Sequence, residues 1–123
     1  MLYAILCYDD ESVVEAWSKE KDDSVMAELG AVTGKLAEER RLGPVARLMS
    51  TKAAATVRKG KTAVVTDGPF AETKEHLLGF YVVECVSLDS AIDVAKELAS
   101  ASGSAGAFEI RPIRLFMPGS GVT

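Results

Sequence analysis

Two segments of the chain are apolar at almost every position. Residues 2–8 read Leu-Tyr-Ala-Ile-Leu-Cys-Tyr, and residues 77–86 alternate so that both faces are apolar and only Glu84 interrupts one of them. A short apolar run bounded by polar residues is typical of a strand that is covered on both faces. Both segments are therefore predicted as buried strands.

Apolar residues at helical spacing predict one short and two long helices. Ser12 and Glu15 form a capping-box pattern, which predicts a short helix over residues 12–19. A longer helix is expected over residues 24–41, where apolar side chains recur every three or four positions. The same spacing predicts a third helix over residues 88–100.

Gly30 and Gly34 lie four residues apart in the second predicted helix. Each glycine should weaken the helix by up to about 1 kcal/mol relative to alanine. Tertiary packing must then hold the helix, and we expect the two glycines to let its backbone approach the sheet closely.

The remaining predicted strands complete the order of strands and helices of an α+β fold. Residues 45–49 and 108–115 are candidate strands, and residues 54–58 and 62–66 flank Lys-Gly-Lys as a β-hairpin. The order is strand, helices, strand, inserted hairpin, strand, helix, strand. We therefore predict a βαββαβ fold with an inserted β-hairpin.

The two strands that are apolar on both faces predict a subunit interface. Two core helices can cover only one face of a four-stranded sheet, so the other face needs a partner. A homodimer joined sheet to sheet would cover it, because two-fold symmetry prevails among soluble oligomers. The alternative is a monomer in which residues 48–66 fold over the sheet.

Length and composition restrict the class of protein. A chain of 123 residues, 48% hydrophobic and 26% charged, is typical of one soluble globular domain, which we place at residues 1–116 with a flexible tail at 117–123. A net charge of −4 without a dense basic block disfavours nucleic-acid binding. Without an apolar run of roughly 20 residues or a basic leader, we predict a cytoplasmic protein with no membrane segment.

The cysteine and histidine content predicts neither a disulfide framework nor a metal site. Cys7 and Cys85 are far apart and lack CxxC spacing, so they are interpreted as small buried hydrophobic residues. With a single histidine there is no spaced set of metal ligands, although a site made of carboxylates alone stays open. We expect no cofactor.

The candidate chemistry is concentrated just before the second apolar strand. Asp67-Gly68-Pro69 predicts a tight turn, because glycine tolerates backbone angles closed to other residues and proline fixes its own φ. Phe70 follows as an apolar anchor. The next polar run contains two carboxylates, a hydroxyl, an ammonium and the only imidazole of the chain: Glu72, Thr73, Lys74, Glu75 and His76.

This region resembles a known family. Asp-Gly-Pro-Phe-Ala-Glu-Thr-Lys-Glu at 67–75, with Leu-Gly-Phe-Tyr at 78–81 and Glu-Ile-Arg-Pro-Ile at 109–113, resembles the DGPF family of small bacterial proteins, a branch of the YCII-related group. The resemblance covers residues 1 to about 114. It implies a ferredoxin-like α+β fold that dimerises into an α/β barrel. It implies no settled reaction, since the family is largely uncharacterised.

The resemblance also implies an enzymatic hypothesis. YCII-related proteins are suspected to use a histidine paired with a carboxylate, and dimeric α/β barrels hold small cyclic or aromatic metabolites between sheet and helices. Here His76 would be the base, with Asp67 or Glu72 as the carboxylate that orients it. Lys74 or Arg111 would anchor a substrate carboxylate. Such proton transfer needs no cofactor.

A second hypothesis is a binding module without turnover. Its ligand would be a small polar or aromatic metabolite bound by the turn, the polar run and the last strand: Asp67, Gly68, Pro69, Phe70, Glu72, Thr73, Lys74 and Arg111. The resemblance adds a regulatory role, because relatives are often encoded beside alternative sigma factors.

A third interpretation gives the same residues only structural roles. Asp67 would cap the turn, Glu72 would pair with Lys74 on the surface, and His76 would be a solvated residue at the start of its strand. Arg111 would pair across the sheet with Glu84 or Glu109.

Overall fold

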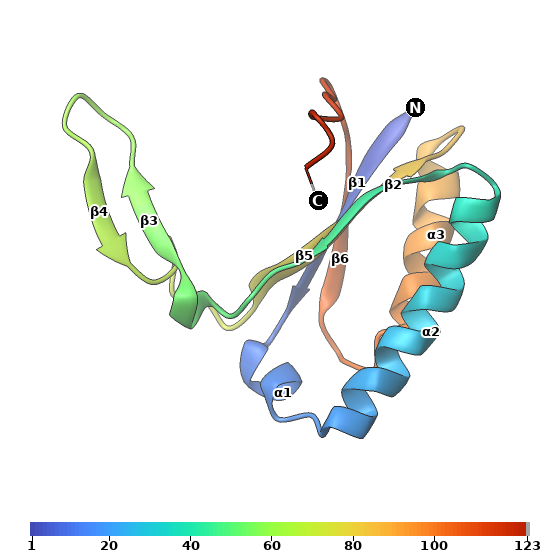
Figure 1. Cartoon of the computed structure of the whole chain (residues 1–123), viewed down its shortest axis with the longest axis horizontal. Coiled ribbons are helices and arrows are strands. Elements are labelled where there is room, and N and C mark those ends of the chain that lie inside the picture. Colours follow the sequence, from blue (N-terminus) through green and yellow to red (C-terminus); the bar gives the residue numbers. More distant parts are fainter. Residues whose placement is uncertain (123) are drawn as a thin grey trace.

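A computed structural model describes residues 1–122 and shows a four-stranded antiparallel sheet with two long helices packed on one of its faces (Figure 1). In spatial order the strands are β2 (Leu42–Arg47), β5 (His76–Glu84), β1 (Leu2–Asp9) and β6 (Ala107–Pro112). The helices are α1 (Glu11–Glu15), α2 (Lys19–Glu38) and α3 (Leu88–Ala101). This arrangement confirms the predicted ferredoxin-like α+β order.

A separate hairpin is inserted between β2 and β5. It consists of β3 (Ala55–Arg58) and β4 (Val64–Asp67), follows the short 3₁₀ helix η1 (Thr51–Ala53), and projects away from the sheet (Figure 1). The inserted hairpin is therefore confirmed. Its strands pair only with each other, in an antiparallel register that runs from Ala55 opposite Asp67 to Arg58 opposite Val64.

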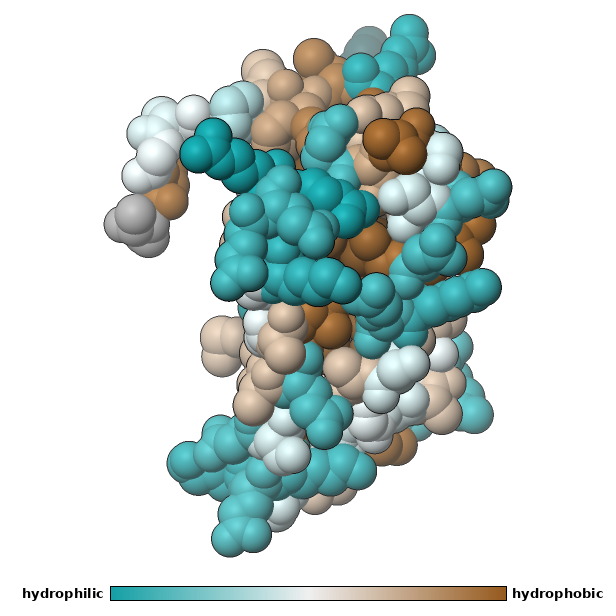
Figure 2. Space-filling model, turned by 90° about the vertical axis from the view of Figure 1, so that its right-hand side faces the viewer, coloured by the Kyte–Doolittle hydropathy of each residue, from teal (hydrophilic) through white to brown (hydrophobic). Residues whose placement is uncertain are grey.

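The core lies between the sheet and α2 and α3. Ile5 of β1, Val83 of β5 and Leu98 of α3 are completely buried. Alternate residues of β1 and β5 point toward the helices, as the pleat of a strand requires. The buried cluster contains residues from both strands and both helices: Tyr3, Ile5, Leu36, Val83, Cys85, Ala91, Val94, Ala95 and Leu98. Figure 2 shows the helix side of the molecule, where hydrophilic residues predominate and apolar residues are visible between them.

Several predicted boundaries were wrong: the short helix ends at Glu15 and not at residue 19, and the second helix ends at Glu38 and not at residue 41. Helix α2 begins at Lys19, five residues before the predicted start, because the Ser18 side chain accepts a hydrogen bond from the Lys21 backbone N–H at 3.1 Å and caps the helix. Strand β2 begins at Leu42 and not at residue 45 as predicted, so it includes Gly43 and Pro44. Proline is tolerated there because β2 is an edge strand with an irregular register against β5.

The close backbone approaches occur at glycines other than those predicted. Gly30 and Gly34 are exposed, and a Cβ atom on either would meet nothing within 4 Å. By contrast, a Cβ on Gly79 would lie 2.4 Å from the backbone oxygen of Ala46. The expectation that the α2 glycines permit close packing on the sheet is therefore wrong.

The pairing of β1 with β5 shifts register near its end. Cys7 lies opposite Gly79, but the next residue of β1, Tyr8, lies opposite Leu77, so Leu78 has no opposite residue on β1. Beyond this bulge, Asp9 lies opposite His76. Since opposite residues of an antiparallel pair share a face, the shift puts His76 on the same side of the sheet as Asp9.

The chain after β6 forms no helix or strand as far as residue 122. The last strand ends at Pro112 and not at residue 115 as predicted. The flexible tail predicted for residues 117–123 stays a prediction, and Thr123 lies outside the described residues. Within residues 1–122, no helix combines the length and the apolar character needed to cross a membrane.

The contrast between Gly79 and Gly30 can be tested by unfolding. Gly79→Ala should lower the free energy of unfolding by about 2 kcal/mol or more, because the new Cβ collides with the backbone of β2. Gly30→Ala should raise it by up to about 1 kcal/mol, since the methyl group meets open space in a helix. Urea denaturation followed by circular dichroism measures both. Equal effects of the two variants would contradict this account of the sheet.

Candidate functional site

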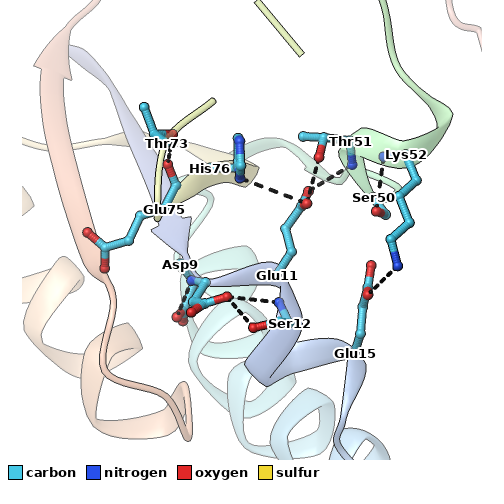
Figure 3. A network of polar contacts seen from close by, with 11 residues as sticks. Asp9, Glu11, Ser12, Glu15, Ser50, Thr51, Lys52, Thr73, Glu75 and His76 are labelled. Atoms are coloured by element: carbon cyan, nitrogen blue, oxygen red, sulfur yellow. Dashed lines mark hydrogen bonds and ion pairs between the residues drawn. The ribbon is translucent and has the colours of Figure 1, made fainter. Parts of the chain in front are cut away.

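A polar cluster joins three separate segments at the end of β1 (Figure 3). Glu11 Oε2 lies 3.8 Å from His76 Nδ1. The same carboxylate accepts hydrogen bonds from Thr51, from the backbone N–H at 2.8 Å and from the hydroxyl at 2.7 Å. The side chains of His76 and Glu11 are only 15% and 14% exposed, so the cluster is largely shielded from water.

The N-terminal caps of α1 and η1 orient Glu11 and Thr51 toward each other. Asp10 caps α1 by accepting a hydrogen bond from the Ser12 N–H at 2.9 Å, which places Glu11 in the first turn. Ser50 caps η1 in the same way through the Lys52 N–H at 3.2 Å, which leaves the Thr51 N–H free to bind Glu11.

The hydrogen bonds at Glu11 favour its ionised form. The Thr51 hydroxyl lowers the pKa of the Glu11 carboxyl below its ordinary value, and the Thr51 N–H, His76 and Lys52 act in the same direction, while burial opposes them. Glu11 is therefore a carboxylate at neutral pH.

The imidazole of His76 carries an unsatisfied atom. Its Nε2 is fully buried and, within residues 1–122, has no hydrogen-bond partner. An imidazole that turns Nδ1–H toward Glu11 keeps Nε2 as a free acceptor, which is the arrangement of a general base. The 3.8 Å separation exceeds a hydrogen bond, so the pair must close by a short movement to become a working dyad.

Next to the cluster, a cavity of about 120 Å³ lies between the sheet and the first two helices. Its wall is almost entirely apolar, and it is formed by α1, α2, their linker and strands β2, β5 and β6: Val14, Trp17, Val25, Met26, Leu29, Val45, Ala46, Leu78, Gly79, Phe80, Tyr81 and Phe108. Cys7 and Asp9 line both this cavity and a second one of about 80 Å³. The two cavities thus adjoin at the end of β1.

Asp9 is the one charged residue in the buried set of the described chain, at 6% exposure. Its Oδ1 accepts the Asp10 N–H at 2.8 Å, and none of the ion pairs within residues 1–122 includes it. Gly106 permits this burial, because a Cβ there would lie 2.8 Å from Asp9 Cγ. Burial, together with the nearby Asp9 charge, raises the pKa of the Cys7 thiol to about 11, so this thiol stays protonated.

The Asp-Gly-Pro-Phe turn packs against its own hairpin. Gly68 has a φ of +92°, donates its N–H to the Ala54 carbonyl at 2.8 Å and accepts the Thr56 hydroxyl at 2.9 Å. Phe70 is 73% exposed, and the Arg58 guanidinium lies 5.2 Å from its ring centre. Asp67 ends β4 and is exposed, and Pro69 is half-buried.

The other predicted residues lie on exposed surface. Glu72, Thr73 and Lys74 are exposed, and the Thr73 hydroxyl donates to the Glu75 carbonyl at 2.6 Å. Arg111 is exposed on β6 opposite Ala4. No residue from 67 to 74, nor Arg111, lines either cavity.

Of the predicted set, the structure brings His76 alone to a carboxylate that is largely shielded from water. That carboxylate is Glu11, so the pairing of His76 with Asp67 or Glu72 stays a prediction. Sequence reasoning missed Asp9, Glu11 and Thr51. The acidic run that follows the first strand was the available signal for the first two, whereas the distant Thr51 had none.

Two comparisons with known proteins each cover nearly the whole chain. A family model described as the YCII-related domain matches residues 1–117. A relative from Rhizobium meliloti (strain 1021), named "Uncharacterized protein R00369", is 59% identical over 121 residues, which is 97% of both chains.

The hydrogen bonds from Thr51 to Glu11 predict that the free energy of unfolding depends on pH. Because the folded-state pKa of Glu11 lies below its ordinary value of 4.5, the carboxylate stabilises the fold above that value, and the contribution is lost as pH falls through the folded-state pKa. Thr51→Val removes the hydroxyl donor. It should raise the Glu11 pKa and cost about 1 kcal/mol at neutral pH, and the difference from wild type should shrink in acid.

Carboxyl NMR titration and urea unfolding at neutral and acid pH measure this effect. Thr73→Val is the matched control, because the Thr73 hydroxyl bonds a backbone carbonyl and no carboxylate. An unchanged Glu11 titration in Thr51→Val would refute the role given to Thr51.

Proposed function

This chain belongs to the YCII-related family, and we propose that it binds a small, mainly apolar molecule in the cavity between the sheet and the first two helices. The single observation that carries the proposal is an apolar cavity with one buried carboxylate, Asp9, at its end. Ligand sites in proteins typically combine an apolar wall with a few placed polar groups.

The size of the cavity limits the ligand. An apolar cavity of about 150 Å³ engineered into another protein binds benzene. A cavity of about 120 Å³ therefore suits a single ring or a short branched chain. This agrees with the small aromatic metabolite that the family resemblance implies.

A second candidate function, acid/base chemistry on the bound molecule, is favoured by His76. Its buried Nε2 lacks a partner, and its Nδ1 faces Glu11. His76 lies beside the cavity, because Asp9 lines the cavity wall and Asp9 is directly opposite His76 in the sheet. Proton transfer between a base and an acid that are both within reach of one substrate requires no cofactor.

We further propose that the protein is a homodimer joined through the open face of the sheet. Both long helices pack on the other face (Figure 1). Leu2, Ala4 and Leu6 alternate with residues of the core cluster along β1, and they are only half-buried in the single chain. A second copy would cover them and form the dimeric α/β barrel that the resemblance implies.

Two finer assignments stay predictions from the motif and the resemblance. The run at residues 67–75 assigns the chain to the DGPF branch of the family. The regulatory role beside alternative sigma factors rests on the resemblance alone, since no feature of residues 1–122 specifically favours it.

Filling the cavity should abolish binding. Leu29→Phe adds ring atoms to the cavity wall, whereas Leu29→Met, the matched control, conserves volume. In a panel of one-ring compounds with neutral, cationic and anionic substituents, at least one should bind wild type and Leu29→Met. Its affinity for Leu29→Phe should fall at least about tenfold. Calorimetry measures this, and equal affinity for all three proteins would place the ligand elsewhere.

Native mass spectrometry of freshly purified protein would show any retained metabolite. Turnover of that compound by wild type, with turnover lost and affinity kept in His76→Gln, would support the catalytic candidate over simple binding.

The dimer has its own test. Leu6→Glu places a charge in the proposed interface and should halve the mass measured by sedimentation, because a buried unpaired charge is costly. Val86→Glu is the control, since Val86 is 95% exposed and lies outside the sheet. A wild-type protein that is monomeric at micromolar concentration would overturn the proposed dimer.

A further inference from the structure

We infer that the cavity selects a small amine, with one ring or a short branched chain, whose ammonium group binds the Asp9 carboxylate. The inference rests on the proposed function, because it names the chemical class of ligand for the same cavity. It is carried by the charges around that cavity and by the hydrogen-bonding capacity of its few polar residues.

Asp9 lacks a cationic partner. The residue is 6% exposed, and the ion pairs within residues 1–122 leave it out. Its Oδ1 accepts one backbone N–H, from Asp10, whereas a carboxylate offers about four acceptor positions. An ammonium group would supply an opposite charge and further hydrogen-bond donors to this carboxyl group.

The other ionisable residues of the cavity do not offset this charge. Arg47 lines the cavity, but its guanidinium bonds both oxygens of Asp22, at 2.7 and 3.4 Å, so that pair is neutral. The Cys7 thiol is uncharged because burial and Asp9 raise its pKa to about 11. Burial likewise raises the pKa of the Tyr81 phenol, which is therefore uncharged. Asp9 is the only carboxyl side chain that lines the two cavities in residues 1–122, and no lining cation pairs with it, which favours a cation over an anion as the ligand.

The place of Asp9 suits an ammonium group at one end of an apolar ligand. Asp9 lies where the apolar cavity meets the smaller second cavity, and Ser102 and Ser104 line both. The Ser102 hydroxyl already donates to the Ala99 carbonyl at 2.9 Å, so its lone pairs are free to accept a hydrogen bond. The apolar part of the ligand would lie against aromatic walls such as Trp17, Tyr81 and Phe108.

Three probes of one shape test the inference on the full chain. Benzylamine, benzyl alcohol and benzoate share a ring and differ in charge at neutral pH. By calorimetry, benzylamine should bind wild type at least about tenfold more tightly than benzyl alcohol, and benzoate should show no binding. Asp9→Asn should remove the preference for the amine. Glu109→Gln, which removes an exposed carboxylate on β6, should leave the preference unchanged.

The outcomes separate the inference from the proposed function. If benzyl alcohol or benzoate binds wild type as tightly as benzylamine, the choice of an amine is overturned while the cavity remains a binding site. If none of the one-ring compounds binds, the proposed function fails as well. The wild-type comparison needs no variant, so the test holds even where Asp9→Asn does not fold.

Discussion

Both the hydrophobic core and the candidate site depend on the pairing of β1 with β5. It aligns the two most apolar segments of the chain, and Ile5 and Val83 on their inner faces are completely buried. Hydrophobic burial of this kind is the dominant favourable term in folding. The same pairing carries the one-residue shift after Cys7 that brings Asp9 opposite His76. The regular part of the pairing builds the core, and the irregular part builds the candidate site.

The candidate site brings together two polar groups that lower the stability of the fold. A carboxylate without a cationic partner at Asp9 and a buried imidazole nitrogen without a hydrogen bond at His76 lie at adjoining positions of the sheet. Groups of this kind lower stability, so they are typically found where a protein binds or transforms something. An apolar cavity adjoins them, and it would shield a ligand from water and strengthen the electrostatic interactions at Asp9.

The Asp-Gly-Pro-Phe turn belongs to a different part of the molecule. Its backbone bonds to Ala54 and Thr56 hold it on the projecting hairpin, and none of its residues lines the described cavities. The visible contacts of this motif therefore stabilise the hairpin. The relative from Rhizobium meliloti carries no assigned activity in its name, so the ligand must be sought from the chemistry of the cavity.

The order of strands and helices could be predicted from sequence alone. Apolar runs and helical spacing are local patterns, and they identified β1, β5 and α3 within one or two residues at each end. The turn at Gly68 also follows from local chemistry. The candidate site does not. Strict alternation from Phe80 would put His76 on the open face, and only the bulge at Leu78 turns it toward the helices. Glu11 and Thr51 meet because separate caps at Asp10 and Ser50 orient them across 40 residues of chain, a distance that no local pattern spans.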